Sequence, residues 1–388
     1  MDLSNDLKNE LALIKTRIDK EESDVLEQFL AKCKTSEDVH ILTVRYKHLL
    51  GEKYSSDWGA FVYEPIKRPL KIAYLLNPDK IFYNEIDYVI CNYLRNEGAE
   101  VIPFTYNDFF FKAHSNGIDL YINNEATELD GFLSYGYRSK ENTEIYMHIV
   151  YMMEQKGVTC LHSYDIDRVL NSKLLQSIHF GKAKVPIPDT YQTFDIKSTK
   201  SLVDSVDIAP CMVKLHDDYG GAGVSKIDHK NGIVNFVGKC IWKKEYILLQ
   251  KFVPDSIGRS IRVLCFNGKT FSIIEFEDCS GAILSNASFG DKFRMNSLMF
   301  HPKYSIYAEV AEKAISSIGN ILIAGIDILD SHAEGIVVLE VNGFPDIFDN
   351  WLTTGKCGFQ KLAEYINRKD LYASDAIPPR LYDVVKAY

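Results

Sequence analysis

Apolar residues recur at two different spacings along the chain, and these spacings predict its helices and strands. In the first 55 residues they recur every three or four positions, as on one face of a helix, at Leu3, Leu7, Leu11, Ile14 and Ile18. Beyond residue 69, short apolar runs alternate with helical stretches. This alternation predicts an α/β fold in which helices cover a mainly parallel sheet.

The alternation is clearest between residues 70 and 165. Strands are predicted at residues 70–76, 101–104, 121–122 and 132–135, and helices at about 84–96 and 141–156. Residues 56–69 contain two prolines, Pro65 and Pro69, and are predicted to be a linker. We therefore expect a small parallel-sheet domain that follows a helical extension.

Two apolar runs near the C-terminal end, residues 325–329 and 336–342, are predicted to form a hairpin around a loop at 330–335. Side chains alternate faces along a strand, so Glu340 and Asn342 point the same way. A four-residue loop at 332–335 would place Asp327 opposite Glu340. Two carboxylates about 4 Å apart repel by roughly 4 kcal/mol at an effective dielectric constant of about 20. Such a patch either binds a cation such as Mg²⁺, which prefers oxygen ligands, or is a solvated face whose acids avoid each other.

These runs resemble a known family. Ala324–Leu329 followed by Leu339–Pro345 is similar to the metal-binding end of the ATP-grasp fold, and most similar to that of RimK-like enzymes, which ligate amino acids to a carboxylate. The resemblance extends over roughly residues 165–368. It implies that Asp327, Glu340 and Asn342 hold Mg²⁺ against ATP, with Mn²⁺ as a substitute.

Two lysines and a glycine-rich loop extend the resemblance. Lys173 opens a helix after Asn171-Ser172, and Lys214 lies on a short strand; the family places both lysines on the nucleotide phosphates. The loop at 217–224 has glycine in three of four positions, which lets backbone N–H groups approach phosphate oxygens, at Gly220, Gly221 and Gly223. It lacks the Gly-Lys-Ser/Thr ending of a Walker A loop.

Further along, residues 247–253 are predicted to be a buried strand that leads into the adenine hinge. The resemblance implies nucleotide contacts there, mainly through the backbone, at Gln250, Lys251, Phe252 and Val253. Arg262 matches an arginine that faces the terminal phosphate and the acyl-phosphate, and with Lys214 it is assigned a catalytic role. Ser260 replaces an aspartate of the family, and Phe289 replaces an arginine that holds the acidic amino acid in glutamate ligases. Glutamate is therefore not implied as the added residue.

The implied fold is an ATP-grasp domain preceded by a small parallel-sheet domain and an N-terminal helical extension. The expected boundaries are 1–69 for the extension and linker, 70–165 for the pre-ATP-grasp domain, 166–370 for the ATP-grasp domain and 371–388 for a tail. Within the ATP-grasp domain we expect a lid subdomain at about 185–250 and a metal-bearing subdomain at about 251–370.

Length, net charge and cysteine content limit the domain count, the binding partners and the cellular compartment that we expect. A chain of 388 residues is too long for one typical core, and its net charge of −9 argues against broad binding to nucleic acid or to an anionic membrane. Its eight cysteines include no CxxC pair, so buried thiols in a reducing cytoplasm are expected. Neither a signal peptide nor a membrane-spanning apolar run is apparent.

The leading functional hypothesis is an ATP- and Mg²⁺-dependent carboxylate–amine ligase that forms an amide through an acyl-phosphate and releases ADP and phosphate. The alternatives are an ATP-grasp kinase acting on a small-molecule hydroxyl and a non-catalytic nucleotide-binding scaffold. The expected partners are a small-molecule or peptide substrate with a carboxylate and an amine co-substrate. A homo-oligomer is also expected, with the N-terminal helices as one candidate interface.

Overall fold

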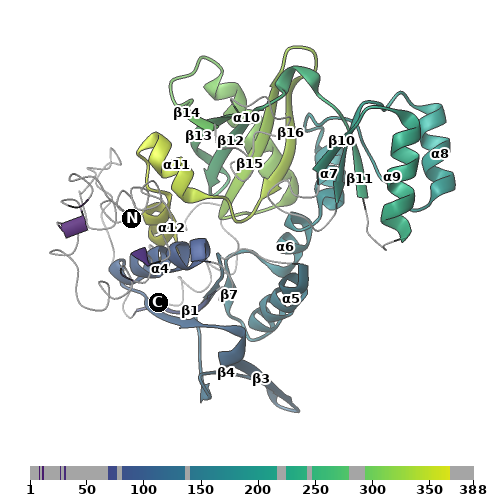
Figure 1. Ribbon diagram of the computed structural model, residues 1–388. Coiled ribbons are helices and arrows are strands. Elements are labelled where there is room, and N and C mark those ends of the chain that lie inside the picture. Colours follow the sequence, from purple (N-terminus) through teal and green to yellow (C-terminus); the bar gives the residue numbers. More distant parts are fainter. Residues whose placement is uncertain are drawn as a thin grey trace.

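The computed structural model describes residues 69–76, 81–135, 140–215, 224–242, 247–278 and 293–367, with Lys8, Leu11, Ala12, Glu27, Leu30 and Ala31 near the N-terminus. The predicted N-terminal helices, the linker and the tail at 371–388 lie outside the described residues, apart from these few positions and Pro69. Figure 1 shows a sheet with α4 and α5 in the lower half, a large antiparallel sheet above it, and a small sheet with α8 and α9 to one side.

The first sheet confirms the predicted parallel arrangement. Its strands run in the order β2-β1-β6-β7 and pair in parallel, with bounds β1 (Lys71–Leu75), β2 (Glu100–Phe104), β6 (Gly131–Leu133) and β7 (Thr159–Cys160). Helices α4 (Ile81–Asn96) and α5 (Lys140–Gln155) form the connections. Gly98, with a φ of 97°, follows α4 and ends it.

The strand predicted at residues 121–122 forms, but its assignment to the parallel sheet was wrong. Residues 121–122 belong to β4 (Gly117–Ile122), which pairs antiparallel with β3 (Phe109–His114) and β5 (Glu125–Ala126) in a separate sheet. A parallel neighbour needs a crossover of a dozen residues, whereas β3 and β4 are joined by the two residues 115–116 and so form a hairpin. This hairpin projects at the bottom of Figure 1.

The predicted lid region contains an antiparallel sheet and two helices. The strand order is β10-β9-β11-β8, with bounds β8 (Thr190–Tyr191), β9 (Cys211–Leu215), β10 (Val224–Ile227) and β11 (Ile247–Lys251). Helices α8 (Ile196–Ser205) and α9 (Lys230–Trp242) pack against each other. A separate hydrophobic cluster forms this region's core, with Val213, Ile233, Val237 and Leu249 buried within it.

The large sheet carries the predicted metal hairpin. It is antiparallel, with order β14-β13-β12-β15-β16 and bounds β12 (Arg259–Phe266), β13 (Lys269–Asp278), β14 (Phe293–Ser297), β15 (Ile323–Ser331) and β16 (Gly335–Asn342). Helix α10 (Tyr304–Ile318) packs on this sheet through Tyr307, Ala311, Ala314 and Ile315. Nearby are helices α6 (Tyr164–Leu170), α7 (Lys173–Ala183), α11 (Ile347–Thr354) and α12 (Gly358–Asn367), and the short 3-10 helix η2 (Pro254–Ser256). A second 3-10 helix, η1 (Tyr106–Asp108), lies between β2 and β3.

The first sheet and the large sheet share one hydrophobic core. Helix α12 packs against α4, and a single cluster contains Ile72 and Leu94 from one side and Trp351 and Phe359 from the other. Tyr93 stacks on Phe359, with ring centroids 6.4 Å apart. The predicted boundary near residue 165 is therefore crossed by apolar packing, and the division into domains stays a prediction.

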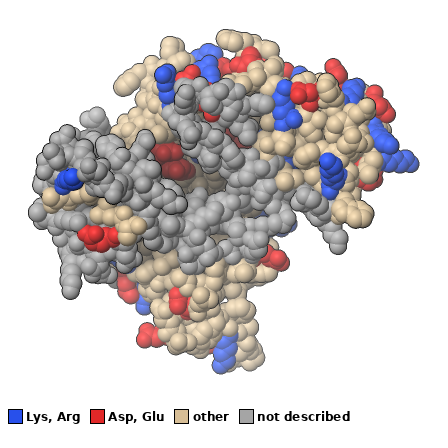
Figure 2. Space-filling model, in the orientation of Figure 1, with Lys and Arg blue, Asp and Glu red and all other residues tan. Residues whose placement is uncertain are grey.

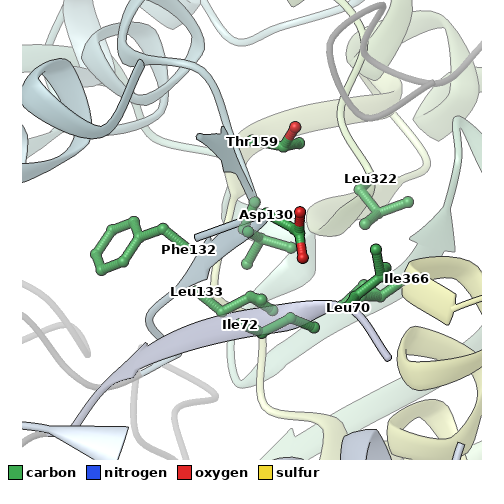
Figure 3. A pocket seen from close by; sticks show the side chains of 10 residues that line it. Leu70, Ile72, Asp130, Phe132, Leu133, Thr159, Leu322 and Ile366 are labelled. Atoms are coloured by element: carbon green, nitrogen blue, oxygen red, sulfur yellow. The ribbon is translucent and has the colours of Figure 1, made fainter. Parts of the chain in front are cut away.

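A small cavity lies within this shared core. Figure 3 shows Ile72 and Leu133 near Leu322 and Ile366, with Asp130 and Thr159 close by. The cavity measures about 20 Å³, which is enough for one water molecule. Gly131 also lines it, and a Cβ built there would lie 3.6 Å from Ile72 Cγ1, an ordinary contact.

Surface and buried features agree with the composition. Figure 2 shows basic and acidic side chains interspersed over the part of this face that is described. Among the described cysteines, Cys91, Cys160, Cys211, Cys240 and Cys265 are buried thiols and Cys357 is partly exposed. Within the described part of the chain, no helix is long and apolar enough to cross a membrane.

Two glycine substitutions should shift stability in opposite directions. Gly131→Ala should raise the free energy of unfolding by about 0.5–1 kcal/mol, because glycine in a strand costs this much relative to alanine. Gly358→Ala should lower it by about 1–3 kcal/mol through overpacking, since its Cβ would lie 2.6 Å from Cγ2 of the buried Ile347. Urea unfolding of both variants and the wild type measures the difference; the opposite order would contradict this description of the core.

Candidate active site

The predicted hairpin forms, with Asp327 opposite Glu340, but its loop length and its strand register differ from the expectation. Its loop has three residues instead of four, because Ser331 pairs with Gly335. The register then shifts between Asp327 and Ile328, where Ile328 pairs with Val338 but Asp327 pairs with Glu340. Leu339 is thus the extra residue of a β-bulge. Without this bulge Asp327 would face Leu339, and Glu340 would lie on the other side of the sheet.

Arg262 reaches the same patch from the neighbouring strand. It pairs with Asp327 across β12 and β15, and its guanidinium binds both carboxylate oxygens, with Nη2 donating to Oδ2 at 2.9 Å and Nε donating to Oδ1. Both side chains are largely buried, with 15% and 17% of their surface exposed. Although burial opposes its charge, Asp327 and Glu340 raise the pKa of Arg262.

Two lysines complete the charged cluster around Glu340. Lys214 is buried on β9, and Lys173 is the first residue of α7. Burial favours the neutral acid, but Lys173, Lys214 and Arg262 together lower the pKa of Glu340. Burial also lowers the pKa of Lys214, against the opposing effect of Glu340. The fold therefore brings together five predicted site residues from five separate elements.

The donor set matches the chemistry of a magnesium site. Asp327, Glu340 and Asn342 supply hard oxygen donors, the kind that Mg²⁺ prefers. Asn342 Oδ1 accepts a hydrogen bond from the Phe344 N–H at 3.0 Å, which turns this side chain toward its own loop. In the described ranges, no cluster of three or more His, Cys, Asp or Glu residues is placed to hold a metal. The candidate site therefore depends on the asparagine as its third donor.

Three residues of the predicted hinge donate hydrogen bonds within the protein. The Lys251 and Phe252 N–H groups donate to the carbonyls of Asp189 and Pro210, at 2.8 and 3.2 Å. Gln250 donates from Nε2 to the Thr190 hydroxyl at 3.0 Å. These donors are engaged within the protein, so a base edge would meet Val253 or carbonyl oxygens. The nucleotide contacts of this segment stay a prediction.

Lys251 has a role that the sequence did not indicate. Its Nζ donates to Glu334 Oε1 at 2.8 Å, at the tip of the metal hairpin. Asp255, four positions after Lys251, also binds the hairpin loop: its Oδ2 accepts hydrogen bonds from the N–H groups of His332 and Ala333, at 2.5 and 3.3 Å. The hinge segment is thus tied to the hairpin loop. The predicted phosphate-binding glycines Gly220, Gly221 and Gly223 lie outside the described residues.

The loop after Asn342 is held by an aromatic cage that sequence reasoning missed. The Phe344 ring lies 5.8 Å from Tyr135, 6.4 Å from Tyr146 and 5.2 Å from His162, centroid to centroid. Tyr135 donates its hydroxyl to the Pro345 carbonyl at 2.6 Å. Gly343 allows this approach, because a Cβ there would lie 2.7 Å from Leu170 Cδ1 and 3.0 Å from His162 Cε1.

A buried polar pair lies behind the cage. His162 Nδ1 is 3.4 Å from Asp167 Oδ1, and neither side chain is exposed. Tyr146 donates to the other carboxylate oxygen of Asp167 at 3.1 Å, and His162 Nε2 lies 3.2 Å from the Ile323 carbonyl. The ends of the first sheet therefore support the loop that follows Asn342.

This geometry agrees with the comparison to known families. Residues 169–366 match the RimK-like ATP-grasp domain, which is just over half of the chain. The chain belongs to the RimK-like ATP-grasp family. The predicted family and fold class are therefore confirmed.

Two curated relatives of this RimK-like chain are named as glutamate ligases. It is 28% identical over 186 residues to a "Probable alpha-L-glutamate ligase" of Syntrophotalea carbinolica, covering 47% of this chain and 59% of that protein. It is 26% identical over 255 residues to "Probable alpha-L-glutamate ligase 1" of Shewanella baltica, covering 65% and 82%. The chain thus spans little more than half of the first relative and most of the second.

Solved structures show the same fold. The ATP-grasp ligase PsnB, complexed with a phosphomimetic variant of its minimal precursor, Mg and ADP, matches with a TM-score of 0.55 at 13% identity. The match covers 76% of this RimK-like chain and 97% of PsnB.

Replacing Lys214 should weaken nucleotide binding without changing the fold. Lys214→Met should raise the dissociation constant for Mg²⁺-ATP at least tenfold, because a charge-assisted contact contributes about 1.5–3 kcal/mol. Isothermal calorimetry measures this constant. Lys239→Met, which removes an exposed lysine of α9, is the matched control and should bind as the wild type does. An unaltered constant in Lys214→Met would argue against a phosphate contact.

Proposed function

We propose that this protein is an ATP-dependent carboxylate–amine ligase that forms an amide bond and releases ADP and phosphate. The observation that carries the proposal is the charged cluster in which Arg262, Lys214 and Lys173 surround the paired carboxylates Asp327 and Glu340. Membership of the RimK-like family and the names of the curated relatives support the same class.

The proposed reaction has two steps. An oxygen of the substrate carboxylate attacks the γ-phosphorus of ATP, and the bond to ADP breaks to leave an acyl-phosphate. The amine nitrogen then attacks the acyl carbon, phosphate leaves, and the amine gives up one proton to form the neutral amide. A carboxylate alone is a poor electrophile, because its leaving group would be oxide, and phosphorylation removes this obstacle.

The charged side chains would act mainly by positioning and by compensating charge. Lys173 and Lys214 would bind phosphate oxygens as compact cations. Arg262 has a planar fork that fits two oxygens of the transferred phosphoryl group, and it now binds Asp327 in that manner. Each carboxylate oxygen accepts more than one interaction, so Asp327 can keep this contact and still serve as a metal ligand.

Asp327, Glu340 and Asn342 would hold Mg²⁺. When bound, the ion would neutralise charge on the nucleotide phosphates. PsnB, whose fold is similar, was solved with Mg and ADP, which supports this assignment. The same oxygen donors would accept Mn²⁺.

The substrates are proposed by class. The curated relatives are named glutamate ligases, whereas Phe289 replaces the arginine that the family uses for an acidic amino acid. We therefore propose an amino acid or a peptide as one substrate without assigning glutamate. The cytoplasmic location and the homo-oligomer stay predictions.

A phosphate-release assay tests the reaction class. The protein is incubated with Mg²⁺-ATP and pairs drawn from a panel of amino acids, glutamate included, and short peptides. Phosphate should appear only when a carboxylate and an amine are both present, with an amide product detected by mass spectrometry. A stable phosphorylated product would identify a kinase instead, and nucleotide binding without turnover would identify a scaffold.

Glu340→Gln should abolish ADP formation, with turnover at least a hundredfold lower, because one charged metal ligand is lost. The variant should stay folded, with a single cooperative urea transition. Glu312→Gln is the matched control, since Glu312 lies on α10, where its carboxylate binds Lys269 Nζ at 2.8 Å. It should keep full activity. Turnover by Glu340→Gln at the wild-type rate would contradict the site.

A further inference from the structure

We propose that Gln176 is a positioning residue that holds the bulged register of β16 and thereby keeps Glu340 and Asn342 on the face of Asp327. The inference rests on the proposed function for its meaning, because those three residues are the proposed metal ligands. Gln176 lies on α7 and is 3% exposed.

Gln176 binds the backbone of the residue between the two ligands. Its Oε1 accepts the Val341 N–H at 2.7 Å, and its Nε2 donates to the Val341 carbonyl at 3.0 Å. The same Nε2 also donates to the Leu170 carbonyl at 2.9 Å. The amide thus takes the place of a strand neighbour at the edge of the sheet, where β16 is the last of the described strands.

These bonds can form only when the bulge is present. In a regular edge strand, the backbone groups that point away from the sheet belong to alternate residues. Two residues of β16 form backbone hydrogen bonds on the side that faces away from β15. The Val338 N–H donates to the Pro186 carbonyl at 2.8 Å, and the Val341 N–H donates to Gln176 Oε1. They are three positions apart, so one extra residue, Leu339, must lie between them. In an unbulged strand, the groups of Val341 would turn toward β15 and away from Gln176.

The same contact sets the distance between opposite charges. Gln176 is three residues after Lys173 and therefore in the same turn of α7, which Ser172 caps by accepting the Leu175 N–H at 3.3 Å. Docking this turn on Val341 fixes where Lys173, at the start of α7, lies relative to the strand that carries Glu340. One buried amide therefore positions two proposed metal ligands and a proposed phosphate ligand.

The test uses Gln176→Met, which keeps the length of the side chain and removes its donors and acceptor, and Gln176→Ala, which leaves room for water to reach Val341. Binding of Mn²⁺ with a non-hydrolysable ATP analogue is measured by electron paramagnetic resonance, and binding of the metal-free analogue by calorimetry. Both variants should bind Mn²⁺ 10–100-fold more weakly, the usual loss for a residue that orients metal ligands. Binding of the metal-free analogue, which does not involve the three proposed metal ligands, should weaken by a smaller factor than Mn²⁺ binding.

Hydrogen exchange provides a readout that needs no metal. The Val341 amide should exchange at least tenfold faster in Gln176→Met than in the wild type, while the amide of Val263 in the middle of the same sheet keeps its rate. Ser272→Ala is the control, because it removes an equally buried hydrogen bond to Asn350 (2.5 Å). It should leave Mn²⁺ binding and the exchange of Val341 unchanged.

The outcomes separate the two proposals. Wild-type protein that fails to bind Mn²⁺ with the nucleotide overturns the proposed function, and exchange at Val341 still decides whether Gln176 holds the register. Unchanged Mn²⁺ affinity or unchanged exchange at Val341 in Gln176→Met overturns the role of Gln176. An equal loss of Mn²⁺ affinity in Ser272→Ala would reduce the effect to general destabilisation and overturn it as well.

Discussion

Opposite charges that are withdrawn from water connect the parts of the ATP-grasp region. Asp327 and Glu340 lie on the hairpin, Arg262 on the adjacent strand, Lys214 on the lid sheet and Lys173 at the start of α7. Burying any of these groups alone would cost several kcal/mol. Each charge therefore depends on partners from other elements, and the relative placement of those elements is tied to the electrostatic balance of the site.

The first sheet contributes to this balance although none of its strands carries a proposed metal ligand. Tyr135 lies just beyond β6, Tyr146 on α5 and His162 after β7, and their rings surround Phe344 in the loop that follows Asn342. The hydroxyl of Tyr135 also binds the carbonyl of Pro345. A change in the first sheet would therefore reach the hairpin through packed rings, without any contact to nucleotide.

Much of this arrangement could be predicted from periodicity and motifs, because local signals determine local elements. The apolar pattern predicted helices near α4 and α5 and the strands of the hairpin. The β-bulge could not be predicted, because Leu339 is apolar like the residues around it. Nothing in the pattern of apolar residues marks it as the extra residue. The expected four-residue loop was wrong, and yet Asp327 does pair with Glu340, because a three-residue loop followed by a bulge yields the same pairing.

Contacts between distant positions were beyond sequence reasoning for a physical reason. Gln176 and Val341 are 165 positions apart, and Tyr135 and Pro345 are 210 apart. Their partners are chosen by the packed fold and leave no periodic signal. The assignment of residues 121–122 to the parallel sheet was wrong for a related reason, since a short turn to β3 offered a nearer partner.

The distribution of apolar packing has a consequence for how substrates are admitted. The first sheet and the large sheet are joined by a continuous core that includes Ile72, Trp351 and Phe359, whereas the core around Val213 and Val237 belongs to the lid alone. Separating the first sheet from the large sheet would expose apolar surface to water. Moving the predicted lid would break mainly polar contacts, such as the ion pair between Lys251 and Glu334. Motion of the predicted lid would therefore leave the first sheet and the large sheet joined.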